Sequence, residues 1–212
     1  LETKVCSVEM RSAALIIVNI PIEDTFVEIG FVGTHLSHIH ESDRKDQIRS
    51  LIHQIPYPTV IMGDLNALYR LDYTQEQWDE INSIRENGGW LFAESRVMDY
   101  LFQSQHYRDT RREYLNITPP QSLNSTINLN RVEGTCRFDT RIDWILLPPV
   151  PTLRREQSPT NLIPYDTSTT TLSSPPISIE IAPNTDGYQV IDTSYYTDHN
   201  LVIVDLLISI QH

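Results

Sequence analysis

The length, composition and charge of the chain limit the classes of protein to which it can belong. Its 212 residues, 40% of them hydrophobic and 21% charged, fit one globular domain spanning residues 1–212. The longest apolar run, Ala13 to Val18, is far shorter than the roughly 20 residues that a membrane-spanning helix needs, so no membrane span is expected. A formal net charge of −12 argues against a broad basic face, so a local site and a metal ion would have to hold any nucleic acid or phosphate.

The first part of the chain has the pattern of two strands followed by a helix. Ala13–Val18 and Phe26–Val32 are short apolar runs separated by turn-forming residues, which predicts two antiparallel neighbours. The second run carries apolar groups on both faces and is expected to be a central strand. A surface helix is predicted from about Ser42 to Pro56, because apolar residues recur at helical spacing at Ile48, Leu51, Ile52 and Ile55.

The alternation of strand and helix continues in the middle of the chain. Thr59–Met62 is predicted to be a compact buried strand. Thr74 and Gln77 have the spacing of a capping box, which opens a second helix that ends at Asn87–Gly89. A shorter helical stretch is predicted at Val97–Phe102.

The last part of the chain combines apolar strands with segments rich in helix and strand breakers. Pro119–Asn130 is predicted to be a polar loop, and Ile142–Leu147 and Leu201–Ile210 are predicted to be strands. Pro148–Pro183 is crowded with Pro, Ser and Thr and shows neither helical nor strand periodicity. We therefore expect a long insertion at about residues 148–183.

Polar residues border the predicted strands at four places. They need an explanation, because an unpaired buried polar group costs on the order of 1–3 kcal/mol. If the strands form two stacked sheets with these ends on one rim, two imidazoles, three carboxylates and an amide converge there, which suits a phosphoester site. The four segments are Thr34-His35, Gly63-Asp64-Leu65-Asn66, Arg141-Ile142-Asp143 and Thr197-Asp198-His199-Asn200.

Each of these segments taken alone has an ordinary structural explanation. A single histidine after a strand is more often a solvated or capped residue than a catalyst, and Asp64-Leu65-Asn66 is common turn chemistry. Asp143 could be a salt-bridge partner at a strand end, and Asp198-His199-Asn200 a turn before the last strand. Their order along the chain is what favours a common site.

In that order the motifs resemble those of the endonuclease/exonuclease/phosphatase family, the metal-dependent phosphoester hydrolases that share the pancreatic deoxyribonuclease fold. The resemblance also covers the predicted first helix, with Arg44, Gln47 and Ile48. It implies an α/β fold, a DNase I-like four-layer α/β/β/α sandwich with the site at one edge of two packed sheets. The matching motifs are Gly33-Thr34-His35-Leu36, Thr59 to Ala67, Arg141 to Leu146 and Thr197-Asp198-His199.

The resemblance also implies a role for each catalytic residue. Asp64 would orient or deprotonate the attacking water, and Asn66 would bond the phosphate oxygens and help to place Asp64. His199 would contact the scissile phosphate, with Asp143 fixing its tautomer and favouring its charged form. His35 would be a second imidazole that binds the phosphoryl group and stabilises its charge in the transition state.

The metal site implied by the resemblance is incomplete. Asp198 would lie at the metal ion, which is expected to be Mg²⁺, with Mn²⁺ as the alternative. Family members carry an Asn and a Gln-Glu pair well upstream of the Thr-His-Leu motif, and that Glu is the principal metal ligand. Glu2 and Glu9 do not sit in this context. We therefore expect the C-terminal two-thirds of the domain, without its N-terminal strands and first helix, either as a fragment or as a degenerate copy.

The implied function is hydrolysis of phosphoester bonds by metal-assisted, in-line attack of water. A nuclease-like phosphodiesterase is preferred over a phosphatase of inositol lipids or other phosphomonoesters. A non-catalytic remnant acting as a binding module stays open, because the upstream Glu is missing. The expected partner is a phosphoester substrate, with nucleic acid among the candidates, and the chain is expected to be a monomer. The sequence assigns no cellular compartment.

Other polar and aromatic residues receive structural interpretations. His38 and His40 are expected to be solvated loop residues and not zinc ligands, since no Cys or carboxylate arrangement flanks them. The basic cluster Arg108, Arg111 and Arg112 is interrupted by acidic residues and is expected to be a solvated helix face. Three tryptophans are expected to be core or sheet-packing aromatics: Trp78, Trp90 and Trp144.

Overall fold

The chain has a mixed α/β fold. The computed structural model describes residues 2–8, 11–22, 25–56, 58–117, 132–150, 177–182, 188–191 and 197–210. Within these residues the strands form one six-stranded sheet and two two-stranded sheets. No helix in the described ranges is long and apolar enough to cross a membrane.

The six-stranded sheet is mixed and has the order β1-β2-β3-β4-β6-β5. In chain order β1 to β6 span Glu2–Val8, Arg11–Ile22, Thr25–Thr34, Thr59–Asp64, Arg108–Asp109 and Asp143–Leu147. β3 and β4 are parallel and all other neighbours are antiparallel. The predicted hairpin is therefore confirmed as β2 and β3, with β3 in a central position, whereas β1 was not predicted.

Helix α1 (Glu41–Gln54) supplies the crossover that the parallel pair β3 and β4 requires. Its position agrees with the predicted helix, and Ile48 and Leu51 are fully buried in the core beside the sheet. The prediction of a surface helix is wrong for part of its polar side, because three polar residues of α1 are also buried: Glu41, Arg44 and Gln47. Their hydrogen bonds are described below.

The predicted second helix is confirmed as α2 (Gln75–Asn87), and its capping box forms. The hydroxyl of Thr74 accepts from the backbone N–H of Gln77 (3.3 Å), and the side chain of Gln77 accepts from the backbone N–H of Thr74 (2.8 Å). The remaining helical elements are short: a 3₁₀ turn at Arg70–Asp72, α3 at Arg96–Asp99 continuing into a π-helical turn at Tyr100–Ser104, and α4 at Thr110–Ile117.

Two small antiparallel sheets are built from the C-terminal part of the chain. β7 (Ile177–Ile181) pairs with β10 (Leu206–Ile210), and β8 (Tyr188–Ile191) pairs with β9 (Leu201–Val204). The prediction of one continuous strand over 201–210 is therefore wrong. The chain leaves the ladder at Asp205, whose carbonyl accepts from a backbone N–H after β7, so the two halves pair with different strands.

The predicted insertion at 148–183 is interrupted by regular structure, because β7 lies within it. A strand can form there since Ile177, Ile179 and Ile181 alternate with polar residues, a strand periodicity that the surrounding breakers mask. Residues 151–176 and the loop predicted at Pro119–Asn130 lie outside the described residues.

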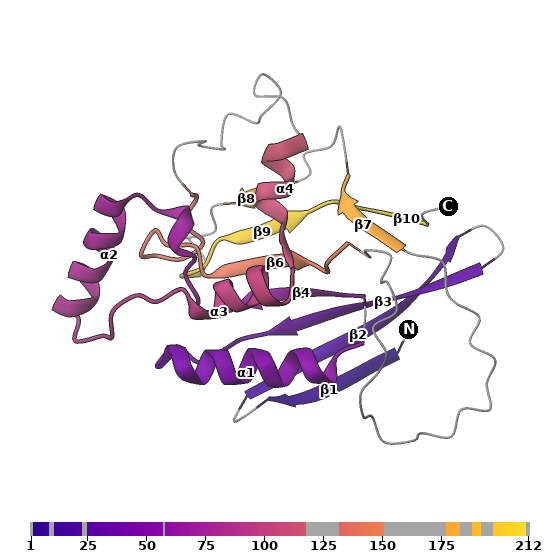
Figure 1. Cartoon of the computed structure of the whole chain (residues 1–212), viewed down its shortest axis with the longest axis horizontal. Helices are drawn as coiled ribbons and strands as arrows, with labels where there is room; N and C mark the ends of the chain where they lie inside the picture. Colours follow the sequence, from indigo (N-terminus) through magenta and orange to yellow (C-terminus); the bar gives the residue numbers. More distant parts are fainter. Residues whose placement is uncertain are drawn as a thin grey trace.

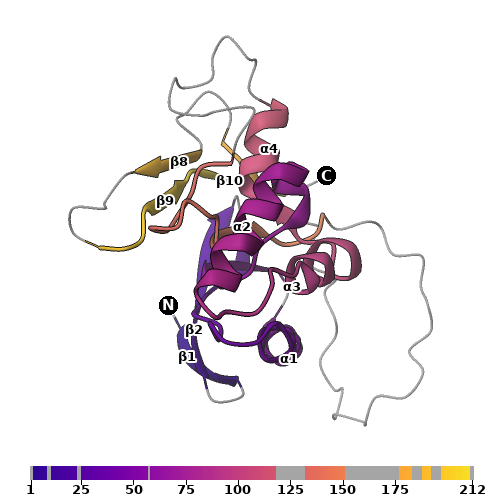
Figure 2. The same ribbon diagram turned by 90° about the vertical axis from the view of Figure 1, so that its left-hand side faces the viewer.

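Two clusters of buried apolar side chains lie on the two faces of the large sheet. On β4, Ile61 belongs to the cluster shared with α1 and α3, and Val60 belongs to the cluster shared with β7 and β8. Successive strand residues point to opposite faces, so α1 and α3 cover one side of the sheet, and α4 covers the other together with the small sheets (Figures 1 and 2). The described residues thus form a mixed α/β core, and the four-layer sandwich stays a prediction.

Candidate active site

Three strand ends meet at one edge of the large sheet (Figure 1). β3 and β4 run parallel and end at Thr34 and Asp64, and β6 begins at this edge because it runs antiparallel to β4. Asp64 and Asp143 stand directly opposite each other in the register of β4 and β6. The sheet itself therefore places two carboxylates side by side.

The turn that follows β4 depends on two residues with left-handed backbone angles. Gly63 has a φ of 128°, and a Cβ atom there would collide with the carbonyl oxygen of Thr34 on the neighbouring strand. Asn66 has a φ of 48°, a conformation that asparagine tolerates. Its backbone N–H donates to Oδ1 of Asp64 (2.8 Å), and its side-chain amide donates to the carbonyl of Leu36 (3.1 Å). Asn66 therefore holds Asp64 and joins the loops after β3 and β4.

His199 reaches this edge because the segment 134–137 holds the chain just before β9. His199 forms an isolated antiparallel bridge with Cys136. Asn200 donates from its backbone N–H to the carbonyl of Thr135 (2.8 Å) and from its side chain to the carbonyl of Gly134 (3.0 Å). The position of the imidazole is thus set by hydrogen bonds on both sides of it.

Thr135 links the segment 134–137 to the beginning of β6. It is fully buried, and its hydroxyl accepts from the backbone N–H groups of Ile142 and Asp143, both at 3.0 Å. Sequence reasoning missed Thr135, since a single threonine outside any periodic segment carries no signal. Its contacts fix the backbone that carries Asp143.

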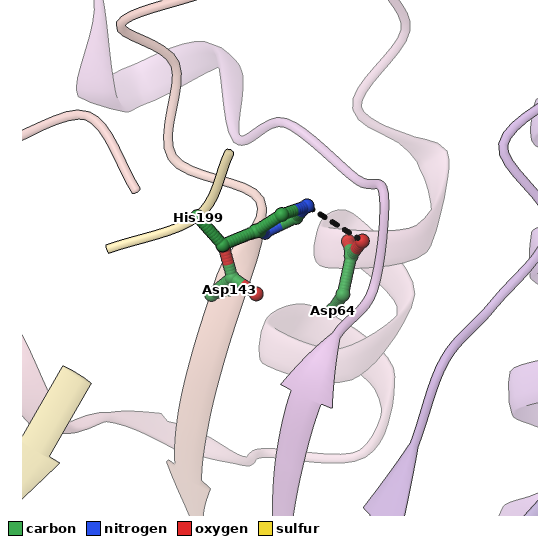
Figure 3. Close-up of side chains that lie close together, drawn as sticks. All are labelled: Asp64, Asp143 and His199. Carbon is green, nitrogen blue, oxygen red and sulfur yellow. Dashed lines mark hydrogen bonds and ion pairs between the residues drawn. The ribbon is translucent and has the colours of Figure 1, made fainter. Parts of the chain in front are cut away.

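Asp64, Asp143 and His199 converge at the edge (Figure 3). Nδ1 of His199 lies 2.9 Å from Oδ2 of Asp143, which leaves Nε2 directed toward Asp64, 3.8 Å from its Oδ2. The same Oδ2 atom lies 3.3 Å from Nε2 of His35, whose side chain is 59% exposed. Two imidazoles, one partly buried and one open to solvent, therefore approach the same carboxylate oxygen of Asp64.

The surroundings shift the pKa of Asp64. Burial raises the pKa of its carboxyl above the ordinary value, and the negative charge of Asp143 raises it as well. The N–H of Asn66 and the two imidazoles lower it but do not cancel the effect of burial. Asp64 therefore holds a proton more readily than a solvated aspartate, and a nearby positive charge would favour its ionised form.

The pKa of His199 is raised. Partial burial lowers it, but the hydrogen bond to Asp143 and the negative charges of Asp143, Asp64 and Asp198 outweigh burial. The protonated ring donates from Nδ1 to Asp143 and presents a second N–H at Nε2. The site can therefore offer a cationic donor to an anionic ligand.

The same three residues could hold a metal ion. Within the described part of the chain, Asp64, Asp143 and His199 are the only group of three such ligands, and their ligand atoms lie within 4.8 Å of one another. Carboxylate oxygens suit a hard cation. A cation between Asp64 and Asp143 would also relieve the repulsion that raises the pKa of Asp64, so the donor set fits a divalent ion.

Asp198, which the resemblance places at the metal, lies outside that group. Its side chain is exposed, and its backbone carbonyl accepts from the N–H of Arg137 (3.0 Å). Its negative charge still contributes to the raised pKa of His199. The other five residues of the predicted site lie together at the edge: His35, Asp64, Asn66, Asp143 and His199.

The loop that carries His35 is held from behind by polar side chains of α1. The side chain of Gln47 accepts from the backbone N–H of Ser37 (2.8 Å), and Arg44 donates to the carbonyl of Ser37 (3.0 Å). Glu41 pairs with Arg44 (2.8 Å) and accepts from a backbone N–H of α3 (2.9 Å). Glu41 was missed by sequence reasoning, because an acidic residue in the first turn of a helix is ordinary capping chemistry.

Arg141, two residues before Asp143, is fully buried. Its guanidinium donates two hydrogen bonds to the carboxylate of Asp109 (2.8 and 2.6 Å) and lies 3.8 Å from the ring centroid of Trp144. The first residue of the Arg141-Ile142-Asp143 motif therefore has a structural role in the interior.

The prediction that Arg108, Arg111 and Arg112 form a solvated helix face is wrong. Arg111 is buried and pairs with Glu133 (2.7 Å), and Arg112 pairs with the buried carboxylate of Asp72 (2.8 Å). Acidic partners distant in sequence hold Arg111 in the interior and Arg112 partly buried, and pairings of this kind have no local pattern.

Two further expectations have different outcomes. His38 and His40 are exposed, which agrees with the prediction of solvated loop residues. Trp144 is buried and Trp78 partly buried, but Trp90 is 47% exposed, so its assignment to the core is wrong.

No protein-family model matches the chain, and no curated protein matches it. Several solved structures are similar. An endonuclease/exonuclease/phosphatase family protein from Bacteroides thetaiotaomicron has a TM-score of 0.38 and 14% identity over 92% of this chain and 54% of its own. A mannosyl-6-phosphatase from the same organism has a TM-score of 0.39 and 14% identity over 93% of this chain and 57% of its own.

A third similar structure is a functionally unknown conserved protein from Enterococcus faecalis. Its TM-score is 0.36, with 17% identity over 65% of this chain and 44% of its own. The chain therefore spans about half the length of these three proteins. TM-scores and identities this low do not establish a shared fold or family.

Proposed function

We propose that the chain is a metal-dependent hydrolase of phosphoester bonds, and that it acts on phosphodiesters. One observation carries the proposal: His199, bonded through Nδ1 to Asp143, directs Nε2 toward Asp64 across the edge of the sheet. The imidazole, oriented by Asp143, can donate a proton or hydrogen bond to a bound phosphoryl group. The carboxylate that it faces, Asp64, can act as a base toward the attacking water. The ordered motifs of the sequence resemble those of phosphoester hydrolases, which supports the same chemistry.

His199 and His35 are proposed to bind the phosphoryl group. In the protonated ring of His199 the N–H at Nε2 donates to a phosphoryl oxygen, while Asp143 holds Nδ1 and keeps the ring in place. His35, whose Nε2 lies 3.3 Å from Oδ2 of Asp64, donates to a second oxygen. Negative charge that develops on these oxygens during in-line attack is then met by two preorganised donors.

Asp64 is proposed to orient the attacking water and accept its proton. Its Oδ1 atom is occupied by the N–H of Asn66, which leaves Oδ2 as the acceptor within the site. The side-chain amide of Asn66 already bonds the carbonyl of Leu36, so one of its two N–H donors remains for a phosphate oxygen.

A divalent cation, Mg²⁺ or Mn²⁺, is proposed to bind at Asp64 and Asp143, with Asp198 as a further ligand at the rim. When bound, such an ion polarises a phosphoryl oxygen and neutralises charge. The backbone of Glu2 pairs with Ile17 in the middle of β2, several residues from the edge.

The ester preference tests the phosphodiesterase proposal. Rates with bis(p-nitrophenyl) phosphate and with p-nitrophenyl phosphate are measured in magnesium, with Asp198→Ala beside the unaltered chain. The proposal expects faster cleavage of the diester and a loss of activity in the variant. Faster cleavage of the monoester would favour a phosphatase, and no cleavage of either ester would favour a non-catalytic binding module.

A further inference from the structure

Two exposed aromatic side chains from distant parts of the chain contact each other. Trp90, just after α2, is 47% exposed, and Phe138, in the turn before β6, is 43% exposed. Their ring centroids lie 5.2 Å apart in an edge-to-face arrangement. The guanidinium of Arg137 lies 4.7 Å from the centroid of the Phe138 ring. We call Trp90, Arg137 and Phe138 the aromatic platform.

The segment that carries Arg137 and Phe138 also positions His199. Cys136 forms the backbone bridge with His199, and the N–H of Arg137 donates to the carbonyl of Asp198 (3.0 Å). Phe138 follows Cys136 by two residues, which span at most about 7 Å of chain. α2 and the start of β9 also lie toward the same end of the molecule (Figure 1). A ligand held at His199 can therefore reach the platform with an adjoining group.

The platform combines π faces with a fixed cation, which limits the ligands that it suits. A nucleobase stacks on aromatic rings and on the guanidinium plane of arginine, and the neighbouring phosphate attracts the same cation. An acyl chain would remove water from the charged guanidinium of Arg137 and offer it no hydrogen-bond acceptor or negative charge in return. The formal charge of −12 also opposes a long polyanion, so the chemistry favours a short nucleotide ligand.

We propose that the aromatic platform binds a nucleobase adjacent to the scissile phosphate, so that the substrates are nucleotide phosphodiesters. The inference rests on the proposed function and specifies its substrate class. The two rings lie at 80° to each other, so the base stacks on one ring and meets the other at its edge. Arg137 lies against the Phe138 ring and meets the phosphate that follows. This role also accounts for two large aromatic rings being left at the surface.

Binding tests the platform without requiring hydrolysis. Tryptophan fluorescence of the full chain is titrated with thymidine 5′-monophosphate and with deoxyribose 5-phosphate, which carries the same phosphate but no base. The expected result is quenching by the nucleotide alone, lost in Trp90→Phe. Phe138→Ala is expected to weaken nucleotide binding by at least about 5-fold. Phe92→Ala removes a neighbouring exposed ring outside the platform and is expected to change nothing.

Equal responses to the two phosphates would overturn the inference. So would an unchanged affinity in Phe138→Ala, or quenching by phosphatidylcholine vesicles in place of the nucleotide.

Kinetics separate failure of the platform from failure of the proposed function. Thymidine 5′-(p-nitrophenyl phosphate) and methyl p-nitrophenyl phosphate release the same product, but only the first carries a base. The inference expects a lower KM for the thymidine ester and loss of that difference in Phe138→Ala. Equal KM values for the two esters would contradict base binding at the platform and would still support the proposed hydrolase. Base-dependent binding without cleavage of either ester would support base binding at the platform and would contradict the proposed hydrolase activity.

Discussion

Nδ1 of His199 lies 2.9 Å from Oδ2 of Asp143, although the two residues are 56 positions apart. The contact forms because β6 presents Asp143 at the sheet edge and the bridge to Cys136 brings His199 to the same place. It orients the ring so that Nε2 faces Asp64, and it raises the pKa of the imidazole. The proposed chemistry depends on this pair.

Asp143→Asn should lower kcat for diester hydrolysis by about 100-fold or more, because the ring loses its orientation and its charged form is no longer favoured. The same change should lower the pKa of His199, since its hydrogen bond and nearest negative charge are removed. Steady-state kinetics and an NMR titration of the imidazole measure the two effects. Asp79→Asn, an exposed carboxylate on α2, serves as the control. An unchanged His199 pKa in Asp143→Asn would show that the contact does not form in solution.

The pair should also make stability depend on pH. The pKa of His199 is higher in the folded protein than in the unfolded chain, so its contribution is complete below the unfolded value of about 6.5 and is lost as the pH rises through the folded value. In metal-free protein the difference in free energy of unfolding between the unaltered chain and His199→Gln should be larger at mildly acidic pH than at alkaline pH. Urea unfolding at several pH values measures it, and a difference that grows with pH would be the wrong sign.

Asp64→Asn should separate activity from stability. The amide can keep the bond from the Asn66 N–H, but it cannot take a proton, so hydrolysis should be lost. Without metal, removing a buried carboxylate that faces Asp143 should stabilise the fold at neutral pH by about 0.5–2 kcal/mol. Urea unfolding in EDTA measures this, and magnesium should then stabilise the unaltered chain but not the variant. If Asp64→Asn is less stable than the unaltered chain in EDTA, the ionised carboxylate of Asp64 does not destabilise the metal-free fold.

Gly63→Ala should destabilise the protein by about 2 kcal/mol or more. The residue has a φ of 128°, and the added Cβ would meet the carbonyl of Thr34. Gly33→Ala is the matched control, because a Cβ at that position meets nothing within 4 Å. Thermal unfolding of both variants compares them. Equal midpoints would place Gly63 in a different backbone conformation.

Arg141→Met should destabilise the protein by about 3–5 kcal/mol, because it leaves the buried carboxylate of Asp109 without its two strongest donors. Arg96→Met removes an exposed ion pair with Glu94 and should change stability by less than about 1 kcal/mol. Chemical unfolding distinguishes the two variants. A small effect of Arg141→Met would mean that other donors satisfy the carboxylate of Asp109.

Local patterns predicted the elements whose stability is local. Each of these patterns involves residues that are only a few positions apart. They are the alternating runs of β2 and β3, the helical spacing of α1 and the capping box of α2. The residues at the site edge were found because each follows or precedes such an element. The interruption of the last strand at Asp205 has no local signal, because it depends on the different strands with which β9 and β10 pair.

Buried polar pairs were the other feature that the sequence did not reveal. Arg141 and Asp109 are 32 positions apart, and nothing near either residue indicates that they meet in the interior. Glu41 and Arg44 have the spacing of a surface pair on a helix and are nevertheless buried. Charged residues are assigned to the surface by default, and only the packing of distant elements shows which of them are inside.

The most direct measurement is the initial rate of p-nitrophenolate release from bis(p-nitrophenyl) phosphate by EDTA-treated protein before and after magnesium is added, with His199→Gln measured in parallel. We expect no release before the addition, release after it, and a rate at least about 100-fold lower in the variant with its far-ultraviolet circular dichroism unchanged. A rate that is independent of magnesium, or equal in the variant and the unaltered chain, would contradict hydrolysis at His199, Asp143 and Asp64.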